Sequence, residues 1–180
     1  LKAATHMEKQ FFSSDKILSL SAMFISLCTL IVFVYQTRLI REQQHMSVLP
    51  YLQMGNGGTH TPNYVYGLRN TGIGPAILTD IKVQKGEGKI FTDINPYIKA
   101  NRNPKDTIGY YHTNIKVGTL IPEKEVIELI KLYDGKIKNG QKLYDVLNDP
   151  DLRIEIEYQS VYGDKWKITN QESVPQKLTK

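Results

Sequence analysis

The pattern of hydrophobic and polar positions is dominated by one uninterrupted apolar run near the N-terminus. Residues 17–35 (ILSLSAMFISLCTLIVFVY) contain no charge, proline or glycine. As a helix these residues would rise about 28 Å, close to the ~30 Å hydrocarbon core of a bilayer. The pattern therefore predicts a transmembrane helix. A cleavable signal peptide is the alternative, but the run is long for a signal core and no A-x-A-like cleavage site follows it.

The segments on either side of the apolar run are polar. Residues 1–6 (LKAATH) resemble a cloning remnant, and we expect Met7 to be the native start of a polar flank at 7–16. Residues 36–47 (QTRLIREQQHMS) contain no helix breaker before Pro50. We expect them to extend the helix by about three turns as a juxtamembrane segment.

From residue 48 onward the pattern changes to short apolar runs separated by turn residues. We expect strands at 48–54, 64–68, 76–84, 89–92, 115–121, 126–133, 152–161 and 166–169. The segment 152–161 (LRIEIEYQSV) alternates most regularly, whereas the apolar spacing of 126–133 (VIELIKLY) would also fit a short helix.

The remaining segments complete the predicted domain. Residues 141–148 (QKLYDVLN) predict one short helix, residues 95–111 are polar and irregular, and residues 171–180 predict a flexible tail. The predicted fold class is therefore mainly β: an N-terminal transmembrane α-helix followed by a β-sandwich or small β-barrel domain at 48–170 with one short helix.

Composition restricts the chemistry that this chain can carry. The only cysteine, Cys28, lies inside the apolar run. This excludes a disulfide framework, a cysteine-rich metal site and a catalytic cysteine in the β-domain. The formal net charge of +5 suits an anionic membrane surface or an anionic ligand, but specifies neither.

The charges that flank the apolar run leave the orientation in the membrane open. Lys9 and Lys16 precede the run, and Arg38 and Arg41 follow it. With two positive residues on each side, the positive-inside rule favours neither orientation. The absence of disulfides favours a cytoplasmic β-domain, and a periplasmic domain is the alternative.

Small and polar residues follow one stripe of the predicted transmembrane helix. Their spacing of three and four residues places them on one helix face, which continues into the juxtamembrane segment: Ser19, Ala22, Ser26, Thr29, Phe33 and Gln36. Small residues allow close approach of helices in lipid, so the stripe predicts a seam for homo-oligomerisation. In a larger ring the same face would line a pore, with Phe33 as its hydrophobic constriction. In the alternative, the hydroxyl groups bond to carbonyls of their own helix and merely tolerate lipid.

Residue patterns typical of enzymes are missing from the sequence. His45, His60 and His112 have no metal-ligand spacing, and Glu155 and Glu157 alternate on the exposed face of a predicted strand. No G-x-S-x-G or Walker-type loop is present, and we expect Gly72 and Gly74 to supply positive φ in a turn. We therefore expect neither catalysis nor a metal or other cofactor.

One segment, 95–116 (NPYIKANRNPKDTIGYYHTNIK), combines cations with aromatic rings. Positive charges beside stackable rings suit a nucleotide or a single-stranded oligonucleotide. The candidate contacts are Lys99, Arg102, Lys105, Tyr110, Tyr111 and His112. The alternative is a solvated loop whose tyrosines fold onto the core.

Several motifs give the chain a resemblance to known proteins. They are Arg41-Glu42-Gln43 after the helix, the SVLPYL run at 47–52, the RNTGIGPA turn at 69–76, and Tyr158 with Tyr162-Gly163-Asp164 and Trp166. With the single N-terminal helix, they resemble small bacterial membrane-anchored β-domain proteins. The resemblance covers about residues 17–169, and its motifs are structural. Proteins of this architecture are found among membrane effectors of anti-phage systems, where a nucleotide-synthesising partner controls an oligomer that permeabilises the inner membrane.

These observations lead to two functional hypotheses. In the first, the chain is a single-pass protein of the bacterial inner membrane that oligomerises through its helix and forms or gates a pore. Its trigger would be a partner protein, such as a nucleotide-synthesising enzyme, or a nucleotide-type ligand. In the second, the helix is only a tether and the β-domain is a scaffold or accessory subunit that binds a partner protein.

Overall fold

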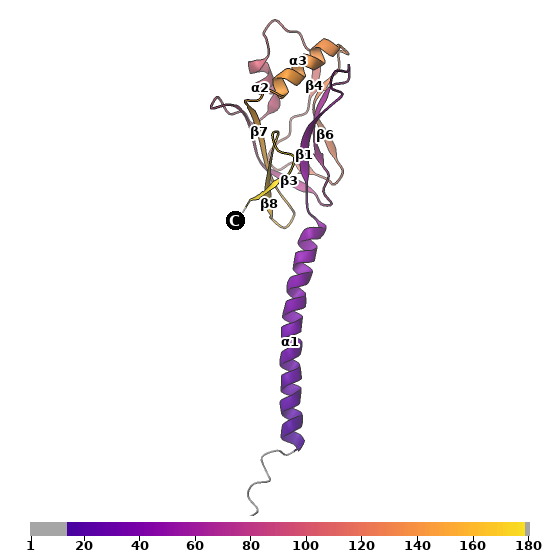
Figure 1. Ribbon diagram of the computed structural model, residues 1–180, viewed down its shortest axis with the longest axis vertical. Coiled ribbons are helices and arrows are strands. Elements are labelled where there is room, and N and C mark those ends of the chain that lie inside the picture. Colours follow the sequence, from indigo (N-terminus) through magenta and orange to yellow (C-terminus); the bar gives the residue numbers. More distant parts are fainter. Residues whose placement is uncertain (1–13, 179–180) are drawn as a thin grey trace, which may run out of the picture. The chain divides into compact units, whose positions relative to one another are not determined.

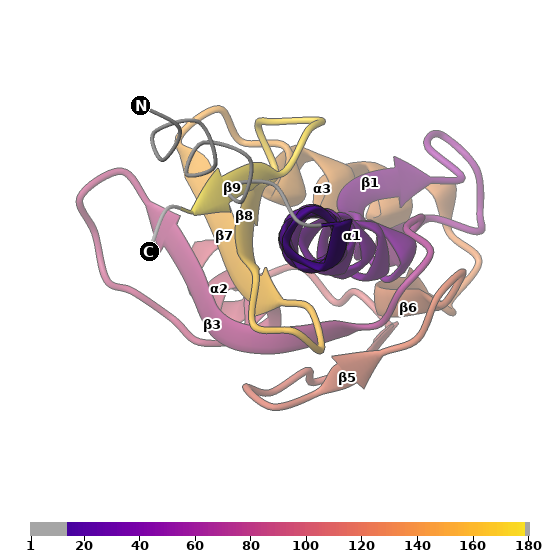
Figure 2. The ribbon, with the colours of Figure 1, turned by 90° about the horizontal axis from the view of Figure 1, so that it is seen from below.

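The computed structural model describes residues 14–178, and the chain divides into two units at residues 45 and 46. The first unit consists of most of helix α1, and the second is the β-domain (Figures 1 and 2). The expected remnant at 1–6 and most of the polar flank at 7–16 lie outside the described residues.

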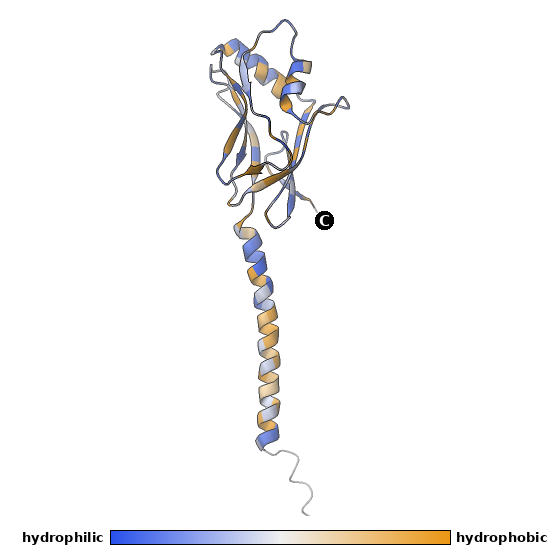
Figure 3. Cartoon of the chain, turned by 180° about the vertical axis from the view of Figure 1, so that it is seen from behind, coloured by the Kyte–Doolittle hydropathy of each residue, from blue (hydrophilic) through white to orange (hydrophobic). Residues whose placement is uncertain are grey.

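Helix α1 (Ser14–Ser47) is continuous over 34 residues, and none of its side chains is buried. Asp15 lies in the first turn, where its negative charge complements the helix dipole, and His45 lies in the last turn. The helix includes both the predicted apolar segment and its extension, and it is long and apolar enough to span a membrane, a test that a signal sequence also passes. Figure 3 shows the apolar residues along this helix and the polar residues that follow them.

The β-domain consists of two antiparallel sheets (Figure 2). The first has the order β1-β2-β6-β4, from β1 (Leu52–Gly57), β2 (Val65–Asn70), β6 (Val126–Leu132) and β4 (Tyr110–His112). The second has the order β5-β3-β7-β8-β9, from β5 (Leu120–Ile121), β3 (Ala76–Lys85), β7 (Leu152–Gln159), β8 (Lys165–Thr169) and β9 (Gln176–Leu178). The mainly β fold is confirmed, and two separate sheets make it a sandwich.

Alternate residues of both sheets meet in one hydrophobic core. Leu68 and Ile130 come from the first sheet, and Ile154 and Ile168 from the second, and each is at most 1% exposed. This alternation, most regular in β7, is the period-two pattern of a half-buried strand. Each sheet therefore also has an outward face.

Two short helices, α2 (Ile94–Asn101) and α3 (Ile137–Leu147), lie at the same end of the sandwich (Figure 1). Helix α3 covers the predicted helix except Asn148, its C-cap residue, and begins four residues before it. Helix α2 was predicted as irregular polar chain. Asp93 caps its N-terminus by accepting a hydrogen bond from the Asn95 backbone, while Tyr97 and Ile98 are buried. Burial of these two side chains stabilises a segment whose composition favours a loop.

Several predicted strand limits are wrong. The strand expected at 48–54 covers 52–57, only Leu120–Ile121 of 115–121 forms a strand, and 89–92 contributes a single bridge between Phe91 and Val83. In the expected flexible tail, Gln176–Leu178 forms β9 and pairs with β8. The ambiguous segment at 126–133 is strand β6.

A buried asparagine fastens the chain where it enters the sandwich. The Asn70 side-chain oxygen accepts from the backbone N–H groups of Tyr51 and Gly72, and its amide donates to the carbonyls of Gly74, Ile121 and Pro122. Asn70 is fully buried. The residues after α1, the RNTGIGPA turn and the end of β5 are therefore joined through one side chain.

The positive φ expected at Gly72 and Gly74 is absent, and close packing explains both glycines instead. A Cβ atom at Gly72 would lie 2.4 Å from the Leu49 carbonyl oxygen, and one at Gly74 would lie 2.1 Å from that of Val48. Because both obstacles are backbone atoms, a side chain could not be accommodated by a rotamer change.

Candidate functional site

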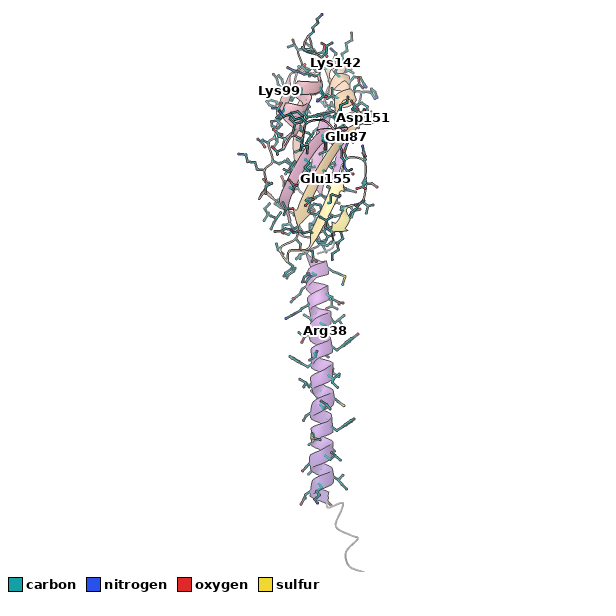
Figure 4. All side chains as sticks on the ribbon, turned by 90° about the vertical axis from the view of Figure 1, so that its left-hand side faces the viewer. Arg38, Glu87, Lys99, Lys142, Asp151 and Glu155 are labelled. Atoms are coloured by element: carbon teal, nitrogen blue, oxygen red, sulfur yellow. The ribbon has the colours of Figure 1, made fainter. Side chains whose placement is uncertain are left out.

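The apolar surface of α1 is uncovered along its length. Phe24 and Phe33 are each 64% exposed, and Leu18, Met23 and Ile31 are similarly exposed. Figure 4 shows side chains projecting from all sides of this helix. A continuous apolar surface of this size requires lipid or other helices around it.

The predicted seam lies on α1, and its hydroxyl groups already donate hydrogen bonds to carbonyls of the same helix. Ser19 donates to the Asp15 carbonyl, Ser26 to that of Ala22, and Thr29 to that of Ile25, each at 2.8 Å. The oxygen atoms keep lone pairs as acceptors. The other seam residues, Ala22, Phe33 and Gln36, are exposed. A seam on this face would rest chiefly on close packing of small side chains.

The predicted cationic residues lie at the helical end of the sandwich. Lys99 is exposed in the last turn of α2, Arg102 is its C-cap residue, and Lys105 lies in the loop that follows. Figure 4 shows Lys99 at the same end as Lys142 of α3. Lys142 itself forms an ion pair with Asp106. The three predicted cations therefore come from one short helix and its exit loop.

Two of the predicted aromatic contacts serve the fold. The Tyr110 hydroxyl donates to the Asn95 side chain at 2.9 Å, and His112 Nε2 lies 2.7 Å from the Asp93 carboxylate. Burial raises the pKa of Tyr110, which keeps its hydroxyl protonated as a donor. Both side chains thus join β4 to the N-terminus of α2.

Tyr111 faces the opposite way and pairs with a residue that the sequence did not single out. Its ring centroid lies 4.8 Å from that of Tyr133, and the two side chains are 64% and 59% exposed. Gly109 makes room for the Tyr133 ring, because a Cβ atom there would lie 2.9 Å from it. We call Tyr111 and Tyr133 the tyrosine pair. It separates Tyr111 from Tyr110 and His112, so the predicted aromatic set does not form one site.

A shallow groove of about 390 Å³ lies on the other half of the first sheet. Its floor contains Gly55, Gly57 and Gly67, and Gly55 is directly opposite Gly67 on the neighbouring strand. Its polar rim includes Gln53, Asn56, Arg69, Glu128 and Glu172. We call this the glycine groove. This groove was not predicted because the first strand was expected to end at Met54. The strand continues through Gly55 to Gly57, and that extension is the signal that could have indicated the groove.

Glu155 of the second sheet belongs to a cluster of ion pairs. The Glu155 carboxylate lies 3.2 Å from Arg153 and 3.6 Å from Lys167, and its side chain is only 15% exposed. Glu157 is also half-buried, so this strand face is less exposed than predicted. Among residues 14–178, no three His, Cys, Asp or Glu side chains gather in a way that could hold a metal ion.

Comparisons with known protein families, curated proteins and solved structures find no match for this chain. The structure itself defines the class of protein. It is a mainly β protein in which a two-sheet sandwich follows one helix that could span a membrane.

Proposed function

We propose that this chain is a single-pass membrane protein that acts by assembly. In this proposal the α1 helices associate in the bilayer, and the β-sandwich controls their association in response to a partner protein or a nucleotide-type ligand. The associated helices form or gate a pore. In the bacterial setting that the resemblance implies, the β-sandwich is cytoplasmic, and the pore permeabilises the inner membrane during anti-phage defence.

The observation that carries the proposal is the uncovered apolar surface of α1. Every described residue of this helix is exposed, including the large side chains from Ile17 to Tyr35. Lipid can cover such a surface, and so can copies of the same helix. The stripe of Ser19, Ala22, Ser26 and Thr29 supports the second arrangement, because small residues allow helix backbones to approach closely.

The trigger is proposed to act on the β-sandwich. Lys99, Arg102 and Lys105 are the candidate contacts for an anionic ligand, since they follow one another in α2 and its exit loop. Tyr111 is the exposed ring of the predicted aromatic set.

A second candidate function is that of a membrane-tethered scaffold. The hydroxyl groups of Ser19, Ser26 and Thr29 donate to carbonyls of their own helix. This arrangement suits a helix that merely tolerates lipid. The β-sandwich would then recruit a protein partner, and α1 would hold it at the membrane.

The test is reconstitution of the full-length protein in liposomes, with and without the products of neighbouring genes. Subunit number and ion conductance are measured together. The proposal predicts a defined oligomer whose conductance responds to a partner. A protein that stays monomeric or never conducts would leave the scaffold as the better account.

A pair of matched variants tests the role of the stripe. Ser26→Leu with Thr29→Leu should reduce both oligomer and conductance, because bulky side chains separate the helices. Ser21→Leu with Cys28→Leu places the same number of leucines on α1 away from the stripe and should leave both unchanged. Equal effects of the two variants would count against a seam on this face.

A further inference from the structure

The end of α1 that follows the apolar run carries two arginines. Arg38 and Arg41 come three and six residues after Tyr35, the last residue of that run. Both side chains are exposed, and within residues 14–178 no ion pair holds either guanidinium group. We propose that Arg38 and Arg41 together bind the phosphate group of an anionic phospholipid. This inference rests on the membrane span in the proposed function and names a lipid that binds beside it.

The spacing of the two arginines suits a single phosphate group. Residues three apart on a helix are neighbours, with Cβ atoms about 5–6 Å apart. A guanidinium group presents a planar fork of N–H donors that matches two phosphate oxygens at once. Arg38 and Arg41 can therefore donate to one phosphate from two sides. This chemistry favours a phosphate over a diffuse negative surface.

The depth of these residues along α1 places them at the lipid headgroups. Tyr35 is the type of aromatic residue that lies at a membrane interface. At a rise of 1.5 Å per residue, Arg38 lies about 4.5 Å and Arg41 about 9 Å beyond it. The headgroup region extends about 5–8 Å from each side of the hydrocarbon core. Arg38 therefore lies within this region, and Arg41 lies at its outer boundary.

The direction of helical side chains brings Arg41 back toward the headgroups. In an α-helix the Cα–Cβ bonds tilt toward the N-terminus, and long side chains follow them. For a cation that follows the apolar run, this direction leads to the bilayer. For Lys16, which precedes the run, the same direction leads away from the bilayer into water. The two ends of the span therefore differ in lipid binding, although their positive charges are equal in number.

The guanidinium groups also avoid the stripe of small residues. Successive residues of an α-helix are about 100° apart around its axis. Arg38 is then about 140–160° from Phe33 and Gln36, the end of the stripe, and Arg41 about 80–140° from the same two residues. Helices that associate through the stripe would leave Arg38 facing lipid and Arg41 beside the contact. Each chain of an oligomer would therefore keep its own lipid site.

Glu42 is the nearest acidic residue that could compete with a lipid. It comes four residues after Arg38 and is exposed. An arginine that precedes a glutamate by four residues is the less favourable order for an ion pair on a helix. Exposed pairs of this kind are also weak. Glu42 therefore lowers the affinity of the site for phosphate but does not fill it.

The experiment counts lipids on the full-length protein. The protein in detergent is titrated with phosphatidylglycerol, and native mass spectrometry measures the number of bound lipids and the apparent Kd. Phosphatidylcholine is the reference, because its choline group cancels the phosphate charge. We expect one tightly bound phosphatidylglycerol per chain and several-fold weaker binding of phosphatidylcholine.

Variants of the charged residues test where this lipid binds. Arg38→Gln with Arg41→Gln should raise the Kd for phosphatidylglycerol about tenfold, because charge-assisted hydrogen bonds are lost. The same two positions changed to lysine should give a smaller loss, since the charge remains without the fork. Glu42→Gln should lower the Kd.

A matched pair of single changes provides the control. Arg38→Gln and Lys16→Gln each remove one positive charge from an exposed position of α1. Glutamine is a good helix former, so both variants should keep the helix. Arg38→Gln should weaken binding of phosphatidylglycerol several-fold, whereas Lys16→Gln should leave it unchanged.

The outcomes separate this inference from the proposed function. Equal weakening by Arg38→Gln and Lys16→Gln would indicate general charge attraction and overturn the site. Unchanged binding in the double glutamine variant, or equal binding of the two lipids, would also overturn it. A defined oligomer that conducts would remain possible in each case. A protein that alkaline extraction releases from membranes would overturn both proposals.

Discussion

At the scale of single residues, Asn70 shows how one side chain organises the start of the β-domain. It satisfies two backbone N–H groups and three carbonyls, which belong to its own turn and to two segments distant in sequence. Buried backbone groups without partners are costly, because water cannot replace the lost bond. These bonds therefore explain the asparagine of the RNTGIGPA motif, and close packing explains its glycines.

Replacement of Asn70 by alanine should destabilise the β-domain strongly. Several buried backbone groups would lose their partner together, so we expect the free energy of unfolding to fall by about 3 kcal/mol. Thermal unfolding of the full-length protein in detergent measures the change. Asn63→Ala, at an exposed loop position, is the control and should change stability little. A loss for Asn70→Ala no larger than the control would contradict the role of this side chain.

Asp134 links stability to pH at the turn between β6 and α3. Partial burial acts to raise its pKa, but hydrogen bonds from the Asn139 side chain and the Lys136 and Gly109 backbones outweigh this and lower the pKa. A carboxyl group whose pKa is lower when folded contributes stability above its unfolded pKa, near 4, and loses it as pH falls through the folded value.

We expect Asp134→Asn to weaken this dependence. Between about pH 5 and pH 2 the unfolding temperature of the unmodified protein should fall more steeply than that of the variant, and the two should converge at low pH. Melting curves across this range measure the difference, with Asp151→Asn on the exposed loop before β7 as control. Parallel curves for the protein and Asp134→Asn would show that Asp134 contributes no linkage.

At the scale of elements, α1 is specified by its own sequence, whereas α2 depends on tertiary contacts. The composition of α1 specifies a helix without any packing, because its apolar run has no breaker over 19 residues. Helix α2 is short and polar, and it depends on the Asp93 cap and on burial of Tyr97 and Ile98. Strand β9 likewise depends on the edge that β8 offers to a polar segment.

A charge in the middle of α1 tests its role as a membrane anchor. Leu27→Arg should make insertion less favourable by about 3 kcal/mol, the cost of an arginine near the centre of a membrane helix. The membrane-bound fraction after alkaline extraction measures this. Thr37→Arg, beyond the apolar run, is the matched control and should remain membrane-bound. Equal retention of both variants would argue against a span centred on this segment.

At the scale of the whole molecule, the outer face of the first sheet combines features that are scattered along the sequence. Tyr111 comes from β4 and Tyr133 directly follows β6, while the glycine groove uses β1, β2, β6 and the loop that contains Glu172. No local pattern connects these segments. The sequence predicted Tyr111 as part of one site with Tyr110 and His112. The three do not form one site, because residues adjacent in sequence alternate between the two faces of a strand.

The sequence by itself determined what depends on short-range physics. It determined the apolar helix, the mainly β domain, the strands with strict alternation such as β7, and the helix at α3, because hydrophobic periodicity and length act within a few turns of chain. Only the tertiary structure decided the pairing of strands into two sheets, the α2 and β9 elements, and the partners of Asn70. It also decided that Tyr111 faces Tyr133 and that Gly55 lies opposite Gly67. These features depend on contacts between residues far apart in sequence, and such contacts exist only once the chain has folded.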